Sequence, residues 1–107
     1  GFGKMAIVEK VTNKIIGYCG IEPCEIAGKE ELELGFRVLN EYRGQGYAFE
    51  AAKSLLNHEV KIDDKRVIAF VKPENYPSIN VLKKLGFKDC GQTSFLGMLV
   101  ILFKQGW

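Results

Sequence analysis

An arginine and two glycines stand directly before a predicted helix in the segment EYRGQGYAFEAAKSLL, residues 41–56. Glycine loses more conformational freedom than any other residue when a chain folds. Gly44 and Gly46 therefore indicate a loop that needs a positive φ or a close approach of the backbone to another group. Exposed N–H groups at the start of a helix attract anions. The segment predicts a phosphate-binding loop, and a plain tight turn is the alternative that the same glycines would serve.

Two common phosphate-binding motifs do not fit this loop. A P-loop requires a lysine and then serine or threonine after its last glycine, whereas Tyr47 and Ala48 follow Gly46. The dinucleotide fingerprint requires a third glycine where Phe49 stands. The kind of phosphate must therefore be inferred from the rest of the chain.

The elements that would position this loop follow from hydrophobic periodicity. Residues 31–38 alternate between apolar and polar side chains, which is typical of a half-buried strand, and residues 67–71 are uniformly apolar, which is typical of a strand buried on both faces. A strand, a helix and a strand in this order form a right-handed crossover with parallel strands. The prediction is an α/β fold with a mixed sheet in the order β-β-β-α-β-α-β-β. The expected strands are 4–10, 15–22, 31–38, 67–71, 87–92 and 98–104, the helices 46–60 and 77–85, and the connections 11–14, 23–30, 63–65 and 93–97.

Length and composition limit the function classes. At 107 residues the chain is long enough for one domain, and its net charge of +2 with scattered lysines does not indicate nucleic-acid binding. The longest apolar run, Met98 to Phe103, is too short to span a membrane, and no segment reads as a signal peptide. Three cysteines without zinc-site spacing indicate a reducing, cytoplasmic location and no metal centre.

Three linked motifs resemble the GNAT superfamily of N-acetyltransferases. Arg43-x-x-Gly46-x-Ala48 matches the acetyl-CoA loop of that superfamily, Q/R-x-x-G-x-G/A. LELGFRVLNEYRGQGYAFEAA (32–52), PENYPSINVLKKLGF (73–87) and IIGYCGI (15–21) are similar to the RimJ/RimL-like subgroup, which acts on the N-termini of ribosomal proteins. The superfamily opens with a strand and two helices, and this chain starts at what resembles the second strand. The resemblance therefore implies a single acetyltransferase domain over 1–107 that is incomplete at its N-terminus.

The resemblance implies where acetyl-CoA would bind. The pyrophosphate would lie on backbone N–H groups from Arg43 through Gly44, Gln45, Gly46 and Tyr47 to Ala48. The Arg43 side chain would either add a positive charge or brace the loop. Backbone groups at Val38 and Leu39 would hold the pantetheine arm, and one of these N–H groups could polarise the thioester carbonyl. Pro77 keeps Asn75 outside the following helix, so its amide is expected to contact the cofactor rather than to serve only a turn.

The resemblance also implies the catalytic groups. Transfer of an acetyl group to an amine requires the neutral amine, and Glu33 is the expected base, acting through water. A solvated carboxylate is its equally weighted alternative, and Glu31 is a weaker candidate. Leu82 stands where many members carry a tyrosine acid, so Ser78 is expected to donate to the thiol, with helix capping as its alternative role. A cysteine nucleophile is disfavoured because His58 lies at the far end of the long helix.

The sequence thus predicts an acetyl-CoA-dependent N-acetyltransferase that acts on a small-molecule or peptide N-terminal amine by direct attack. The alternative is a CoA-binding module that has little catalysis of its own or is completed by a partner chain. The missing elements would leave the Glu31, Glu33 and Arg37 face open. The apolar run from Met98 to Phe103 offers a strand suited to burial, and a sheet edge left unpaired would invite a second chain. The expectation is therefore either self-association over the open face or a longer native chain of which these residues are the ordered part.

Overall fold

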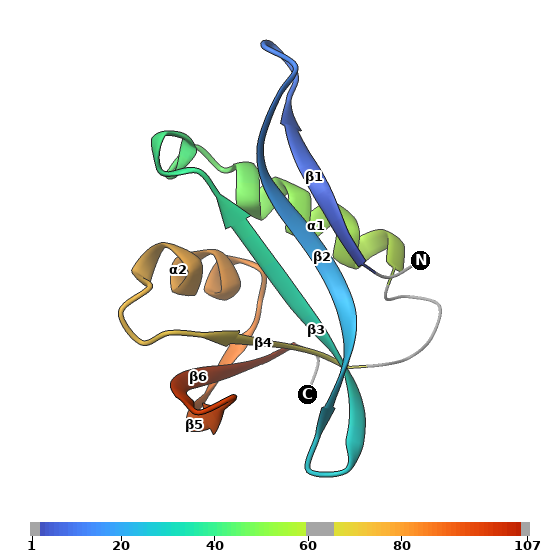
Figure 1. The fold of residues 1–107 in the computed structure, drawn as a ribbon, viewed down its shortest axis with the longest axis vertical. Helices are drawn as coiled ribbons and strands as arrows, with labels where there is room; N and C mark the ends of the chain where they lie inside the picture. Colours follow the sequence, from blue (N-terminus) through green and yellow to red (C-terminus); the bar gives the residue numbers. More distant parts are fainter. Residues whose placement is uncertain (1–2, 60–65, 106–107) are drawn as a thin grey trace.

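The computed structural model describes residues 3–59 and 66–105, which form a six-stranded mixed sheet with two helices (Figure 1). The elements are β1 (Gly3–Glu9), β2 (Lys14–Ile26), β3 (Lys29–Val38), η1 (Asn40–Tyr42), α1 (Tyr47–Glu59), β4 (Val67–Val71), α2 (Tyr76–Lys84), β5 (Lys88–Phe95) and β6 (Met98–Gln105). The predicted order of strands and helices is confirmed, with one short 3₁₀ helix added before the glycine loop. Val60, at the predicted end of the first helix, and the predicted turn at 63–65 lie outside the described residues.

The strands are arranged in the order β1-β2-β3-β4-β6-β5. All neighbouring pairs are antiparallel except β3 and β4, which are parallel as the crossover through α1 predicts. The prediction that the Met98–Phe103 run forms a strand suited to burial is confirmed, because β6 lies inside the sheet and pairs with both β4 and β5. The edges of the described sheet are β1 and β5.

The second and third strands continue through the predicted loop at 23–30. Pro23 has no backbone N–H group to donate, and β2 tolerates it because Pro23 and its partner exchange no hydrogen bond. It lies opposite Leu32, whose N–H points to the other edge of β3 and donates to the Arg66 carbonyl. Ala27 and Gly28, with φ of 50° and 80°, make the tight two-residue turn. The β5–β6 connection is shorter than the predicted 93–97 for the same reason, because Leu96 and Gly97 both have positive φ.

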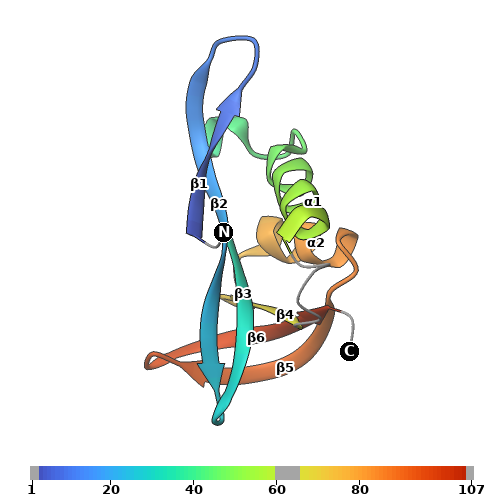
Figure 2. The same ribbon diagram turned by 90° about the vertical axis from the view of Figure 1, so that its right-hand side faces the viewer.

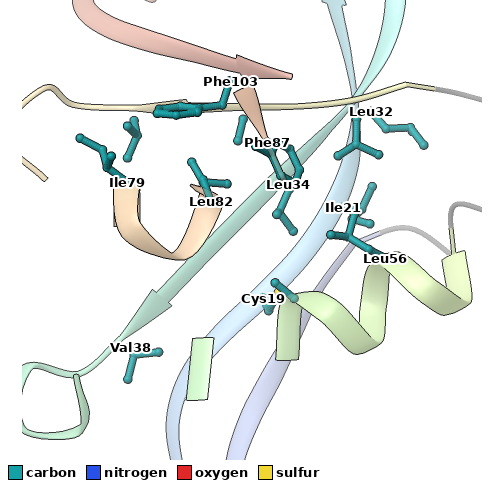
Figure 3. Close-up of a cluster of buried hydrophobic side chains, with 14 of the residues drawn as sticks. Cys19, Ile21, Leu32, Leu34, Val38, Leu56, Ile79, Leu82, Phe87 and Phe103 are labelled. Atoms are coloured by element: carbon teal, nitrogen blue, oxygen red, sulfur yellow. The ribbon is translucent and has the colours of Figure 1, made fainter. Parts of the chain in front are cut away.

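Both helices pack against one face of the sheet, as Figure 2 shows. Apolar side chains of β2 and β3 meet those of the helices there, including Cys19, Ile21, Leu32, Leu34, Leu56 and Leu82 (Figure 3). Val67, Ile68 and Ala69 are all buried, which confirms that β4 is covered on both faces. The opposite face of β2 and β3 carries no helix within the described residues. Glu31 on that face is nevertheless 8% exposed, so this carboxyl group is not part of an open surface.

Candidate functional site

The strands β3 and β4 separate shortly after they begin, and the separation creates the site. Their register includes only Leu32 with Val67 and Glu33 with Ile68, after which the two strands diverge (Figure 1). A cleft of about 1000 Å³ lies there. It is lined by the diverging halves of both strands, by the loop and first turn of α1, by the start of α2 and by the β5–β6 turn.

The backbone of β3 faces this cleft at every second residue. The Leu32 N–H points toward β4, and the Leu39 N–H points the other way, donating to the Ile16 carbonyl at 2.8 Å. Because neighbouring residues of a strand direct their N–H groups to opposite edges, the N–H groups of Phe36 and Val38 face the gap. Within residues 3–59 and 66–105, no strand pairs with this edge beyond Glu33. An extended ligand could therefore hydrogen-bond there as an added strand would.

This geometry changes one predicted contact. Leu39 does not line the cleft, and its N–H group is already used by Ile16, so it cannot hold a ligand from the cleft side. Phe36 takes its place beside Val38. Sequence reasoning missed Phe36, although the alternation of β3 would have paired Val38 with Phe36 rather than with Leu39.

The glycine loop closes one end of the cleft. Gly44 and Gly46 have φ of 76° and 86°, which confirms that the loop needs conformations that favour glycine. A Cβ atom built on either glycine would meet nothing within 4 Å, so the space next to the loop is open. The first turn hydrogen bond of α1 runs from the Glu50 N–H to the Gly46 carbonyl, which leaves the preceding N–H groups of Tyr47, Ala48 and Phe49 unbonded within the helix. This arrangement fits a phosphate group.

Hydrogen bonds within the loop hold it in shape. Arg43 Nε donates to the Val38 carbonyl at 3.2 Å, and Gln45 Nε2 donates to the Glu41 carbonyl at 3.2 Å. The first bond matches the bracing role that was one of the two expectations for Arg43. Gln45 does not line the cleft with its neighbours. Tyr47 contacts Tyr42 edge to face and donates its hydroxyl to Glu9 at 2.6 Å, which ties the start of α1 to the first hairpin.

At the start of α2 the structure gives Asn75 a role other than the predicted one. Asn75 Oδ1 accepts a hydrogen bond from the Ser78 N–H at 3.3 Å, so Asn75 is the N-cap of the helix and its carbonyl oxygen is not free for a ligand. Both residues line the cleft. Because Asn75 caps the helix, Ser78 is not needed for that role. Ser78 lines the cleft, so its hydroxyl is a candidate donor to a bound group.

Glu33 lines the cleft at the point where the strands diverge. Burial raises the pKa of its carboxyl group, the like charge of Glu22 on the neighbouring strand raises it further, and the positive charge of Lys4 lowers it. A carboxylate with a raised pKa in a cleft is a candidate proton acceptor at neutral pH. His58 does not line this cleft, and burial raises the pKa of the Cys19 thiol to about 11. The structure thus brings no histidine–cysteine pair to the site.

The family model of the acetyltransferase (GNAT) domain matches residues 1–88. The chain therefore belongs to the GNAT acetyltransferase family. It is 32% identical over 89 residues to the N-acetyltransferase p20 of Bacillus licheniformis, itself uncharacterized, covering 82% of this chain and 49% of that protein. It is 39% identical over 65 residues to another uncharacterized N-acetyltransferase, YnaD of Bacillus subtilis, covering 60% of this chain and 38% of that one. The chain thus spans about half the length of the curated relatives it matches, or less.

Solved structures show the same fold. A GNAT-family acetyltransferase of Bordetella pertussis superposes with a TM-score of 0.83 at 24% identity, over 98% of this chain and 66% of that one. A ribosomal-protein-alanine N-acetyltransferase of Brucella melitensis superposes with a TM-score of 0.79 at 20% identity, over 98% and 68%. The expected acyltransferase fold is confirmed. No helix in the described part of the chain is long and apolar enough to cross a membrane.

Proposed function

We propose that this domain binds acetyl-CoA in the cleft between β3 and β4 and transfers its acetyl group to a primary amine by direct attack. The observation that carries the proposal is the splayed pair of strands, with a positive-φ glycine loop and the N-terminus of α1 at its end. The backbone from Arg43 to Ala48 would hold the pyrophosphate, favoured by the helix dipole. Phe36 would hold the pantetheine arm through its N–H and C=O groups. Val38 would contribute its N–H group, because its carbonyl already accepts from Arg43 Nε.

Bound acetyl-CoA would supply a thioester whose thiol leaves readily, since a thiol has a pKa of about 8.5. The chain itself must provide a neutral amine and a path for its proton. Glu33 accepts that proton, through water, from an amine whose own pKa is about 8 to 10. Ser78 donates a hydrogen bond toward the leaving sulfur. A backbone N–H on the cleft edge of β3 polarises the carbonyl oxygen.

The amine acceptor is proposed only as a class. The sequence motifs resemble the subgroup that acts on the N-termini of ribosomal proteins. One structural neighbour is named as a ribosomal-protein-alanine N-acetyltransferase, which supports a peptide N-terminus as the acceptor. A chimera of the spermidine N-acetyltransferase SpeG of Vibrio cholerae with hSSAT is also a neighbour, at 16% identity and a TM-score of 0.71. Similarity at this level reflects the shared fold, so peptide N-termini and small amines are both retained.

A second candidate is a CoA-binding module with little catalysis alone, or one completed by a partner chain. The observation that favours it is the face of β2 and β3 that carries Glu33, which no helix within residues 3–59 and 66–105 covers. Self-association over this face stays a prediction, and light scattering on the purified chain tests it.

Release of free thiol from acetyl-CoA, measured over a panel of peptide and small amines, separates the two candidates. Amine-dependent release that falls in Glu33→Gln is expected for the acetyltransferase. Tight acetyl-CoA binding without amine-dependent release would replace it with the binding module.

A further inference from the structure

The cleft between β3 and β4 is lined from both faces of the sheet, so it has two different halves. Strand alternation directs Leu34 and Val38 to the face with the helices, where they belong to the buried core. Glu33 and Arg37 alternate with them and line the cleft from the opposite face. The proposed cofactor site uses the glycine loop, α1 and α2, which lie on the helix side. The half of the cleft that faces away from the helices is therefore left for a second molecule.

Two stacked aromatic rings line this second half of the cleft. Phe70 on β4 lies on the same face as Ile68, which pairs with Glu33, so Phe70 and Glu33 share a face. Phe95, at the end of β5, stacks on Phe70 with ring centroids 4.1 Å apart and an angle of 11° between the ring planes. Both rings line the cleft and are partly exposed. The adjoining β5–β6 turn lies on the side of the sheet away from the helices (Figure 2).

Two further apolar side chains extend the stacked pair. Leu96 in the β5–β6 turn and Met98 at the start of β6 are exposed, and both line the cleft. Single exposed apolar side chains are common on protein surfaces, whereas a contiguous group of them with polar neighbours marks a binding site. We call Phe70, Phe95, Leu96 and Met98 the aromatic wall. It gives this end of the cleft a surface suited to an apolar ligand group.

The charged groups of the cleft limit the ligand further. Among the described residues that line it, Glu33 is the single carboxylate, and the other charged residues are cationic: Arg37, Arg43, Lys72 and Lys84. Glu22, which pairs with Glu33 across β2 and β3, does not line the cleft. A ligand with several ammonium groups would meet one carboxylate among several like charges, which is unfavourable. One amine beside Glu33 and one apolar group beside the aromatic wall match this arrangement.

We propose that the aromatic wall binds the apolar part of the amine acceptor, so that the domain selects a monoamine carrying an aromatic or large apolar group close to its nitrogen. The inference rests on the proposed function, which makes this ligand the acetyl acceptor. A ligand ring that stacks on an aromatic side chain gains more than its buried area alone provides. Polyamines lack such a group and carry additional positive charges, so they are poor ligands of this half of the cleft.

The test uses the two methionines of the chain as NMR reporters. Met98 belongs to the aromatic wall, whereas Met5 on β1 is also exposed but does not line this cleft. The chain is labelled with ¹³C in its methionine methyl groups, and 2-phenylethylamine, ethylamine and spermidine are each titrated with and without CoA. Only 2-phenylethylamine should shift the Met98 signal in a saturable manner, because its ring lies beside that methyl group, and Met5 should not move. An unmoved Met98 signal, an equal shift of Met5, or tighter binding of spermidine would overturn the proposal.

Three variants locate the binding surface. Phe95→Ala removes one ring of the stacked pair and should weaken 2-phenylethylamine binding roughly 2- to 10-fold. Leu96→Ala, at a side chain that is 81% exposed and so contributes little to folding, should also weaken it. Leu99→Ala is the matched control, because Leu99 is an exposed neighbour of Met98 that does not line the cleft. Equal dissociation constants in the wild type, Phe95→Ala and Leu96→Ala would overturn the proposal.

Steady-state kinetics separate this inference from the proposed function. The ratio of kcat/KM for 2-phenylethylamine to that for ethylamine should exceed one and should fall in Phe95→Ala, with the KM for acetyl-CoA unchanged. Saturable binding at Met98 without amine-dependent release of thiol would refute the proposed function and the role as acceptor site together. Acetyl transfer with equal kcat/KM for both amines and an unmoved Met98 signal would refute the present inference alone.

Discussion

Arg43 Nε donates a hydrogen bond to the Val38 carbonyl at 3.2 Å, and this bond joins the glycine loop to the end of β3. The two parts of the proposed cofactor site, the loop for the phosphates and the strand edge for the pantetheine arm, are thereby held at a fixed distance. Because the bond occupies the Val38 carbonyl, the end of β3 can offer a ligand the Val38 N–H group but not its carbonyl. The role of Arg43 as a brace can be separated from a role as a charge.

Arg43→Lys and Arg43→Met should weaken acetyl-CoA binding to a similar extent. Neither side chain offers a donor at the position of the Arg43 Nε atom, so both lose the bond to Val38 although lysine keeps the charge. Loss of one hydrogen bond from a charged donor is worth roughly 1.4 kcal/mol or more, or about tenfold in affinity. Calorimetric titration measures this. Near-native affinity in Arg43→Lys alone would show that the charge matters and the brace does not.

Asn75→Ala and Ser78→Ala should affect different quantities. Asn75 caps α2, so its replacement should lower the free energy of unfolding by about 1 kcal/mol. Ser78 contributes its backbone N–H to the cap and its hydroxyl to the cleft. Ser78→Ala should therefore leave thermal unfolding unchanged and lower kcat for acetyl transfer. Asn75→Asp, which preserves the cap, is the control. A large loss of stability in Ser78→Ala with an unchanged kcat would return Ser78 to a structural role.

Glu33→Gln should make the free energy of unfolding fall less than in the wild type as pH rises from acidic to neutral values. Burial and Glu22 raise the pKa of Glu33, so the folded state binds a proton more tightly than the unfolded chain does. That carboxyl group therefore favours folding below its unfolded pKa and loses this contribution as pH rises through its folded pKa. Glutamine removes the dependence. Chemical unfolding at several pH values between 4 and 8 should show a smaller fall in stability with rising pH for the variant, and an unchanged slope would contradict the assigned environment of Glu33.

Gly17→Ala should be strongly destabilising. A Cβ atom on Gly17 would lie 2.0 Å from the Arg37 carbonyl oxygen, a backbone atom of the neighbouring strand that cannot move aside. We expect a loss of about 1–3 kcal/mol in the free energy of unfolding. Gly35→Ala, on β3 with open space where its Cβ atom would go, is the matched control and should change stability by about 0.5 kcal/mol or less. Equal effects of the two substitutions would show that β2 and β3 do not approach each other as described.

The sequence predicted the order of elements and the glycine loop, because both depend on local patterns. Alternation over Glu31–Val38 and the uniform apolar run of Val67–Val71 predicted two strands of different burial, as observed. What it could not predict depends on pairing. That the strand of Met98–Gln105 lies inside the sheet follows from non-local partners on both sides. That Asn75 caps α2 depends on where the helix begins, within one residue. Leu39 was wrongly placed in the site because the direction of its N–H group depends on pairing with Ile16, which the sequence does not show.

The central claim is that the backbone at Gly44–Ala48 holds the phosphates of acetyl-CoA, and a comparison of two glycines tests it most directly. Gly46 and Gly28 have φ of 86° and 80°, and both have open space around a built Cβ atom. Alanine at either position therefore carries a similar backbone strain of about 1–2 kcal/mol. Only Gly46 lines the cleft, whereas Gly28 is at the β2–β3 turn.

The measurement is calorimetric titration of acetyl-CoA into the wild-type chain, Gly46→Ala and Gly28→Ala, with thermal unfolding of each recorded alongside. The account predicts that both variants lose similar stability, that Gly28→Ala binds acetyl-CoA as the wild type does, and that Gly46→Ala loses most of its affinity because the added methyl group occupies the space of the phosphates. Equal affinity in Gly46→Ala and Gly28→Ala would contradict the assignment of the phosphate site.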